Sequence, residues 1–163
     1  MGPDLKKQFF VVGGFYDPSQ LPKTKLESNA WEQALTATGD YRELRPINVD
    51  PGYLTLTKLV LASAKDRAHR IYMSDGIYEE ECLYYLNHGW QSRPWTYPDY
   101  QRYDFQLFFT ETRELLKREI AQAERQPEAH AGDVSGGHNA VVECSQALKE
   151  LRHSSRGPSG EIV

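Results

Sequence analysis

Short apolar runs alternate with turn-forming residues through the first hundred positions, and this pattern predicts β-strands. The runs cover residues 9–12, 45–49, 70–73, 78–86 and 90–93. Asp75-Gly76 separates the third run from the fourth, and Asn87-His88-Gly89 separates the fourth from the fifth. We expect a turn at the first of these sites and a hairpin loop at the second, with Gly89 in the left-handed conformation.

Two longer stretches have the spacing of amphipathic helices. The first runs from about residue 18 to 38, with Asp17 at the capping position and Pro18 at the first helical position. The second runs from about residue 100 to 123, where Phe105, Phe109 and Leu116 share one face. Residues 54–63 suit a strand or a buried helix equally well, and periodicity does not decide between the two.

Strands, helices and an antiparallel hairpin together predict an α+β fold, with mixed α/β as the alternative. A small sheet would then pack against the two main helices. Aromatic residues limit the folded part, because all six Phe, three Trp and ten Tyr lie between Phe9 and Phe109. We predict one globular domain over residues 1–125, followed by a low-complexity, largely disordered tail over 126–163 that folding does not need.

One stretch of this tail has helical spacing. Val141, Cys144, Leu148 and Leu151 follow Asn139, which is a suitable cap. Isolated helices of about 14 residues are marginal in water. We therefore expect a helix here that forms transiently or docks on another surface.

The charge balance narrows the class of partner. Nineteen Lys and Arg stand against 23 Asp and Glu, which gives a formal net charge of −4. A mildly acidic chain is a poor partner for nucleic acid or for a membrane surface, so we expect neither. The sequence contains neither the roughly 18 successive apolar residues of a spanning helix nor a signal-peptide pattern. We therefore expect a cytoplasmic protein in which Cys82 and Cys144 are reduced.

Motifs of the common cofactor and hydrolase folds are absent from the sequence. There is no G-x-x-x-x-G-K-[ST] loop, no G-x-G-x-x-G after a strand, no H-E-x-x-H and no G-x-S-x-G. Cys82 and Cys144 lie too far apart along the chain to suggest a shared metal site. The sequence therefore predicts no metal site and leaves the cofactor unknown. It leaves open whether the protein is an enzyme.

Polar residues that could hold an anion lie between positions 50 and 99. Lys65, His69 and Arg70 form a basic loop that offers many hydrogen-bond donors to a phosphate or carboxylate. A solvated surface loop explains the same residues. Glu79 and Glu81 share one face of the predicted strand, either as a pair for acid–base or metal chemistry or as a solvent-facing edge.

Acidic and phenolic side chains flank this loop in the sequence. Asp50 and Tyr53 lie in a Pro-Gly sequence that predicts a turn, and Asp99 is a candidate cap for the final helix. As functional groups, they would serve as bases or ligands and as the wall of a pocket. The acidic and phenolic candidates are Asp50, Tyr53, Tyr72, Asp75, Tyr97 and Asp99.

Two functions from different classes fit these residues. The first is a site for a small anionic ligand, phosphate-like or nucleotide-like, held by Lys65, His69 and Arg70. The second is a non-catalytic interaction or assembly module that uses exposed Tyr and Trp as anchors. Convergence of the basic loop and the Asp residues on one cleft would favour the first, and a flat aromatic patch would favour the second. The oligomeric state stays open.

Five ordered motifs resemble a bacterial family, domain-of-unknown-function family 4416. They are Arg45-Pro46-Ile47-Asn48-Val49-Asp50-Pro51-Gly52-Tyr53-Leu54, Lys58-Leu59-Val60-Leu61-Ala62, His69-Arg70-Ile71-Tyr72, Gly76-Ile77-Tyr78 and Trp95-Thr96-Tyr97-Pro98-Asp99-Tyr100. The looser resemblance covers about residues 1 to 118. It implies no established activity, cofactor or catalytic residue. It also implies a segment upstream of residue 1, so we expect a chain that begins inside the domain and self-associates through uncovered apolar faces.

Overall fold

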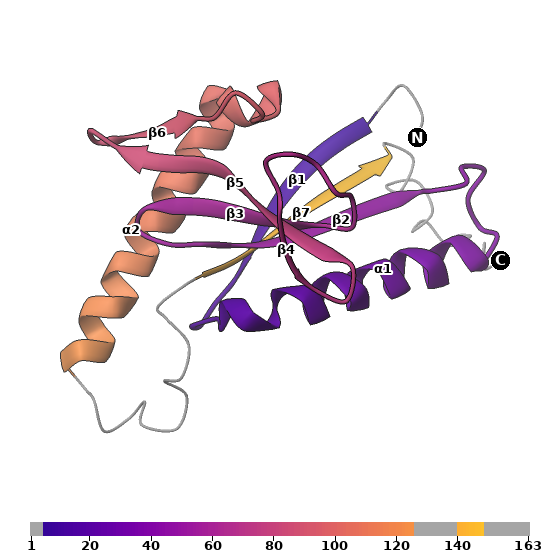
Figure 1. The fold of residues 1–163 in the computed structure, drawn as a ribbon, viewed down its shortest axis with the longest axis horizontal. Helices are drawn as coiled ribbons and strands as arrows, with labels where there is room; N and C mark the ends of the chain where they lie inside the picture. The colour runs from indigo at the N-terminus through magenta and orange to yellow at the C-terminus, as the bar shows by residue number, and fades with distance from the viewer. Residues whose placement is uncertain (1–4, 126–139, 149–163) are drawn as a thin grey trace, which may run out of the picture.

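Seven strands form one sheet in the computed structural model, which describes residues 5–125 and 140–148 (Figure 1). The strands follow the order β1-β7-β2-β3-β5-β4, and β6 pairs with β5. Their bounds are Leu5–Val12 (β1), Ile47–Leu54 (β2), Lys58–Ser63 (β3), Ile71–Ser74 (β4), Ile77–Leu86 (β5), Gly89–Ser92 (β6) and Ala140–Leu148 (β7). The helices are α1 (Leu21–Ala37) and α2 (Tyr103–Arg125), which follow the 3-10 turns η1 (Pro18–Gln20) and η2 (Pro98–Gln101). The fold is α+β, as predicted, and all the described ladders are antiparallel.

The two main helices cover opposite faces of the sheet (Figure 1). Successive residues of a strand point to opposite faces of the sheet, so each central strand contributes side chains to a hydrophobic core on both faces. Val60 of β3 packs with Leu21 of α1 on one face. Its neighbour Leu59 packs with Phe109 of α2 on the other.

Phe9 is the centre of the core under α2. Its ring centroid lies between 4.8 and 5.6 Å from the rings of Tyr100, Phe105, Phe108 and Phe109. Aromatic pairs of this kind contribute about 0.5–1.5 kcal/mol each beyond the area they bury. This cluster fixes η2 and α2 against β1, and thereby places one wall of the site described below.

The first helix begins as predicted but buries a polar face. Asp17 Oδ1 accepts a hydrogen bond of 2.9 Å from the backbone N–H of Ser19, so Asp17 caps η1, and α1 follows directly. The buried side chains of α1 include Lys25, Ser28 and Glu32. An apolar stripe would normally be expected on a packed helix face. The polar groups therefore need partners, and β2 supplies them.

The turn predicted at Asp50-Pro51-Gly52-Tyr53 is wrong, because these residues lie inside β2. Gly52 is required by a close approach of two strands. A Cβ atom at this position would overlap the carbonyl oxygen of Val60 and lie 2.5 Å from Leu61 Cδ2. A Pro-Gly sequence commonly favours a turn. In this protein, its glycine instead permits a close contact between β2 and β3.

The hairpin predictions are confirmed with one correction. The ambiguous residues 54–63 form the end of β2, a short turn and β3. Asp75 and Gly76 have positive φ angles of 52° and 76°, as a tight turn between β4 and β5 requires. In the next hairpin, Asn87 and His88 have positive φ, whereas Gly89 already belongs to β6. Asn tolerates this conformation well, so the left-handed positions fall earlier than predicted.

Residues 140–148, which the sequence pattern assigned to a tail helix, form a strand inside the sheet. β7 pairs antiparallel with β1 on one side and with β2 on the other. The helix prediction is therefore wrong over this segment, because the two flanking strands offer hydrogen bonds along both edges of β7. The remainder of the predicted disordered tail, at 126–139 and 149–163, lies outside the described residues, and so does Leu151.

Candidate functional site

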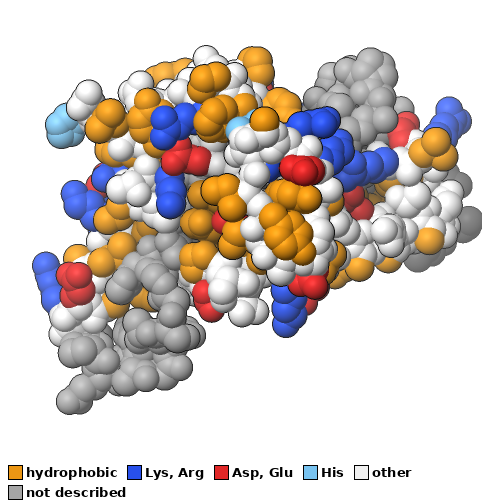
Figure 2. Space-filling view, viewed as in Figure 1, with side chains coloured by type: hydrophobic (Ala, Val, Ile, Leu, Met, Phe, Trp, Pro, Cys, Tyr) orange, Lys and Arg blue, Asp and Glu red, His pale blue; other side chains and the backbone are white. Residues whose placement is uncertain are grey.

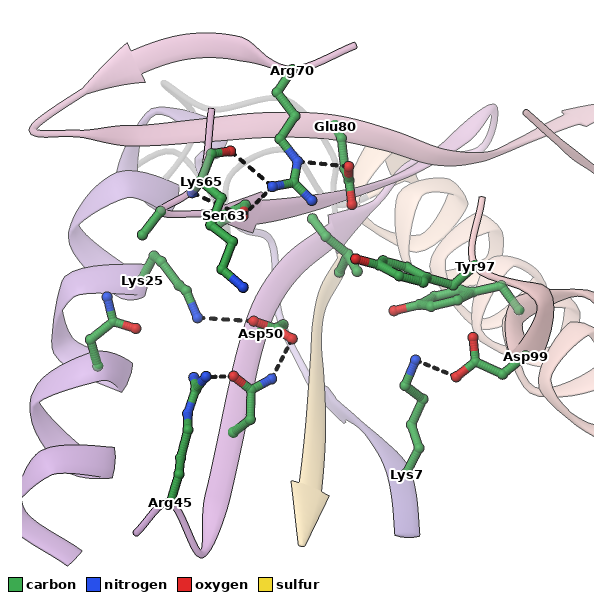
Figure 3. A pocket seen from close by; sticks show the side chains of 16 residues that line it. Lys7, Lys25, Arg45, Asp50, Ser63, Lys65, Arg70, Glu80, Tyr97 and Asp99 are labelled. Atoms are coloured by element: carbon green, nitrogen blue, oxygen red, sulfur yellow. Dashed lines mark hydrogen bonds and ion pairs between the residues drawn. The ribbon is translucent and has the colours of Figure 1, made fainter. Parts of the chain in front are cut away.

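A cavity of about 430 Å³ opens between α1, the sheet and η2 (Figure 3). Its lining is strongly charged, with five cationic side chains and three carboxylates. They are Lys7, Lys25, Arg45, Lys65 and Arg70, and Asp50, Glu80 and Asp99. Their arrangement decides what the cavity can bind.

On the α1 side, side chains of the helix bind backbone groups of β2 at a position where no described strand pairs with this edge of β2. β3 pairs with β2 only from Gly52 to Leu54, so Val49 lies beyond the end of this ladder. Glu32 Oε1 accepts a hydrogen bond of 2.7 Å from the Val49 N–H, and Lys25 Nζ donates one of 2.6 Å to the Val49 carbonyl. These bonds satisfy the backbone groups and explain why α1 buries charged residues.

Asp50 connects this wall to the cavity. Lys25 Nζ lies 3.0 Å from Asp50 Oδ1, and Asn48 Nδ2 donates to Asp50 Oδ2 at 2.6 Å. Arg45 in turn donates to Glu32 at 2.6 Å and to the Asn48 side-chain oxygen. Both cations of this wall therefore face a carboxylate, and the wall carries no excess charge.

On the sheet side, Arg70 holds the loop between β3 and β4. Its Nε donates to Glu80 Oε2 at 2.9 Å, and its Nη1 donates to Ser63 Oγ at 2.7 Å and to the Lys65 carbonyl at 2.8 Å. The side chains of Arg70 and Glu80 are each only 7% exposed. Burial lowers the pKa of Arg70, but the hydrogen bond and charge of Glu80 outweigh it and raise the pKa above its ordinary value. Arg70 is thus a loop-fixing residue whose donors are largely committed to the protein.

Lys65 differs from the other cations of the cavity. Its backbone carbonyl is fixed by Arg70, and its side chain reaches toward the cavity (Figure 3). Within the described part of the chain, its ammonium group has no hydrogen bond or ion pair, whereas the other four cations each have a carboxylate partner. The positive charge of Lys65 is therefore available to a ligand.

On the η2 side, Lys7 and Asp99 form an ion pair of 2.5 Å, and Lys7 lies 4.3 Å from the centroid of the Tyr100 ring. The prediction that Asp99 caps the last helix is wrong, since Asp99 lies within η2 and α2 begins four residues later, at Tyr103. Its partner Lys7 comes from β1, far away in the sequence. Tyr97 presents a ring that is 57% exposed at this wall.

His69 supports the sheet wall from outside the cavity lining. Its Nε2 lies 2.8 Å from Glu80 Oε2, and its ring stacks on Trp95 with 5.1 Å between centroids. His69 and Arg70 therefore share one carboxylate oxygen. That His69 contacts a ligand directly stays a prediction. In the structure, its imidazole contacts Glu80 and Trp95.

Three other candidates lie away from the cavity. Tyr53 is buried on the α1 face of the sheet, where its hydroxyl donates to Glu79 at 3.5 Å. Burial and the charge of Glu79 raise the pKa of Tyr53 to about 12. Tyr72 is exposed on β4 beside Tyr78, and Asp75 lies in the β4–β5 turn. The candidates that line the cavity are Asp50, Lys65, Arg70, Tyr97 and Asp99.

Sequence reasoning missed Lys7, Lys25, Arg45 and Glu80 as lining residues. One signal was present, because Lys25 follows Leu21 on the buried face of a helix, where an unpaired charge would be costly. Such a residue must have a partner elsewhere in the fold. Nothing in the sequence shows that the partner is Asp50.

Metal binding and thiol chemistry find less support than anion binding. The described residues contain no group of three or more His, Cys, Asp or Glu side chains placed to hold a metal ion. Cys82 is a buried free thiol, and burial raises its pKa well above the ordinary value. The described helices are all too short or too polar to cross a membrane.

Fold and site together define a small α+β domain whose charged cavity lies between helix, sheet and a 3-10 turn. The family model described as "Domain of unknown function (DUF4416)" matches residues 1–116, and the chain belongs to this family, as its motifs indicated. Neither the curated proteins nor the solved structures contain a match to the chain. The matched region ends within α2, so β7 lies beyond it.

Proposed function

We propose that the cavity binds a small anionic ligand, such as a phosphate compound, through Lys65. The observation that carries this proposal is the unpaired ammonium group of Lys65, in the described part of the chain, among cations that are otherwise paired. Counting Glu32 with its partner Arg45, five cations face four carboxylates, so the site has one surplus positive charge. An anion in the cavity neutralises this charge.

The geometry also gives Lys65 and Arg70 different roles in this proposal. Arg70 fixes both the carbonyl of Lys65 and the preceding Ser63, which restrains the loop that carries the ammonium group. A loop whose backbone is restrained loses less conformational entropy when a ligand binds. Lys65 is therefore the binding group of this proposal, and Arg70 is a positioning residue.

The proposal is tested by thermal melting during titration with inorganic phosphate. A ligand at 100 times its dissociation constant stabilises a protein by about 2.7 kcal/mol, which is a shift of several degrees. The wild type should show this shift and Lys65→Met should not. Arg67→Met is the matched control, because it removes the same charge from the same exposed loop at a residue outside the cavity lining. Equal shifts in all three proteins would rule out Lys65 as the binding group.

A second candidate function, an interaction module, is favoured by the edge strand β4. Ile71, Tyr72 and Met73 are 71%, 58% and 41% exposed, and the strand contains no charged residue to discourage pairing. Figure 2 shows apolar side chains gathered in the middle of the face where β4 lies in Figure 1. A second copy of the chain could pair antiparallel with this edge. Sedimentation at rising concentration, with Tyr72→Lys as the variant, distinguishes such a dimer from a monomer.

A further inference from the structure

We infer that the ligand of this cavity is a phosphate ester of a polyhydroxylated, sugar-like group. This inference rests on the proposed function, because it assumes that Lys65 holds the anionic end. It depends on what the remaining walls offer to the rest of the ligand. Those walls are built from paired charges, two amides and two aromatic rings.

The two accessible carboxylates of the cavity still have room to accept hydrogen bonds. The side chains of Asp50 and Asp99 are 32% and 36% exposed, although each is paired with a lysine. Asp99 Oδ1 is buried without a hydrogen-bond partner among the described residues, so Oδ2, which Lys7 contacts, is the accessible oxygen of Asp99. Lys65 and Asp99 lie on opposite sides of the cavity in Figure 3. A carboxylate oxygen can accept more than one hydrogen bond. A ligand that reaches from Lys65 toward these walls therefore meets acceptors.

The pairing decides which donors fit best. Lys25 neutralises Asp50, and Lys7 neutralises Asp99, so neither wall has an excess negative charge to attract a cation. A hydroxyl group is neutral, and it both donates to a carboxylate and accepts from an ammonium group. Hydroxyl groups therefore match both members of each ion pair. A second anionic group on the ligand, as in a dicarboxylate, would bring further negative charge toward these carboxylates.

Asn29 and Tyr97 add the remaining contacts. Asn29 lines the cavity from α1, and its amide has both donors and an acceptor. The exposed ring of Tyr97 offers a flat apolar surface at the opposite wall, suited to the C–H face of a sugar. The volume of about 430 Å³ falls within the range of small-ligand sites, about 300–1,000 Å³. These features favour a compact ligand with hydroxyl groups on an apolar frame.

Isothermal titration calorimetry on the full chain tests the inference with three compounds. Ribose phosphorylated on its primary hydroxyl carries both features, propyl phosphate carries the anion without hydroxyl groups, and free ribose carries the hydroxyl groups alone. We expect ribose phosphate to bind at least about tenfold more tightly than propyl phosphate, the gain of one or two additional hydrogen bonds. Free ribose should bind more weakly than either.

Two variants, at the half-buried Asn29 and at the exposed Tyr97, separate recognition from folding. Asn29→Ala and Tyr97→Ala should each weaken ribose phosphate by several-fold and leave propyl phosphate unchanged. Equal affinities of the two phosphates would overturn the sugar-like ligand while phosphate binding stands. Failure of every phosphate compound to bind would overturn both proposals. Free ribose binding as tightly as ribose phosphate would contradict the role of Lys65 and, with it, the phosphate ester.

Discussion

At the scale of single residues, Arg70 lies at the end of the loop between β3 and β4 and binds the start of this loop, at Ser63 Oγ and the Lys65 carbonyl. It also binds Glu80 of β5. Arg70→Met should lower the free energy of unfolding by about 3–5 kcal/mol, because it leaves the buried Glu80 carboxylate without its cation. His69 remains as a partner, so the lower end of this range is expected. Urea unfolding of the variant and the wild type measures the difference.

A double variant identifies the cause of the loss. Replacing both members of a buried ion pair by apolar residues is often neutral or stabilising. The variant with Arg70→Met and Glu80→Met should therefore unfold at a higher urea concentration than Arg70→Met alone. If it is no more stable, the stranded charge is not what destabilises the single variant.

Glu79 gives a pH dependence of stability with a definite sign. Burial raises its pKa above the ordinary value of 4.5, although the Tyr53 hydroxyl and the charge of Lys58 oppose this. The folded protein then holds a proton that the unfolded chain has already released, so stability falls as pH rises from 4.5 through the raised pKa. Glu79→Gln should be more stable than the wild type at about pH 7 and equal to it at a pH below the unfolded pKa. Thermal melting across this range checks it, and a gain that persists at low pH would exclude ionisation as the cause.

At the scale of elements, the contact between β2 and β3 depends on the missing side chain of Gly52. Gly52→Ala should cost about 1–3 kcal/mol or more, because the new methyl group overlaps the Val60 backbone, which cannot yield without moving the strand. Gly13→Ala is the matched control, because a Cβ atom there would have no atom within 4 Å and the φ of Gly13 is not positive. Urea unfolding should separate the two variants clearly. Similar stabilities would show that the strands can separate without cost.

The same element shows where the sequence was sufficient and where it was not. Strong local patterns, such as the stripe of α2 and the hairpin residues at Asp75-Gly76, predicted their structures correctly because local contacts decide them. Pro51-Gly52 misled the prediction, since a turn and a close strand contact both select glycine. The helical spacing at Val141 and Cys144 was overruled by pairing partners far away in the chain.

The candidate site was predictable in part for the same reason. Lys65 and Arg70 were identified because they stand close together in a basic loop. Lys7 and Lys25 were not, because they enter the cavity from a different strand and helix. Only the folded sheet places them beside Asp99 and Asp50.

At the scale of the whole molecule, β7 connects β1 to the rest of the sheet. Ending the chain after residue 125 should lower the melting midpoint by more than about 5 °C, roughly 1 kcal/mol, because β1 loses its described partner and β2 loses one of two. Ending it after residue 148 should cause a smaller change, since β7 is retained. Calorimetry on the three chains provides the comparison. An unchanged midpoint for the shortest chain would instead mean that the tail is dispensable, as its composition predicts.

The position of β7 also has a consequence for the order in which the protein folds. β1 is synthesised before the other described elements, yet its partner β7 follows all the other described strands and both helices. Contacts between residues so distant in the chain require a large loop to close before any hydrogen bond is gained, and such contacts slow folding. Until then, β1 and β2 present open edges that can pair with other chains. Refolding from denaturant should therefore be slow, and its yield should fall as the protein concentration rises.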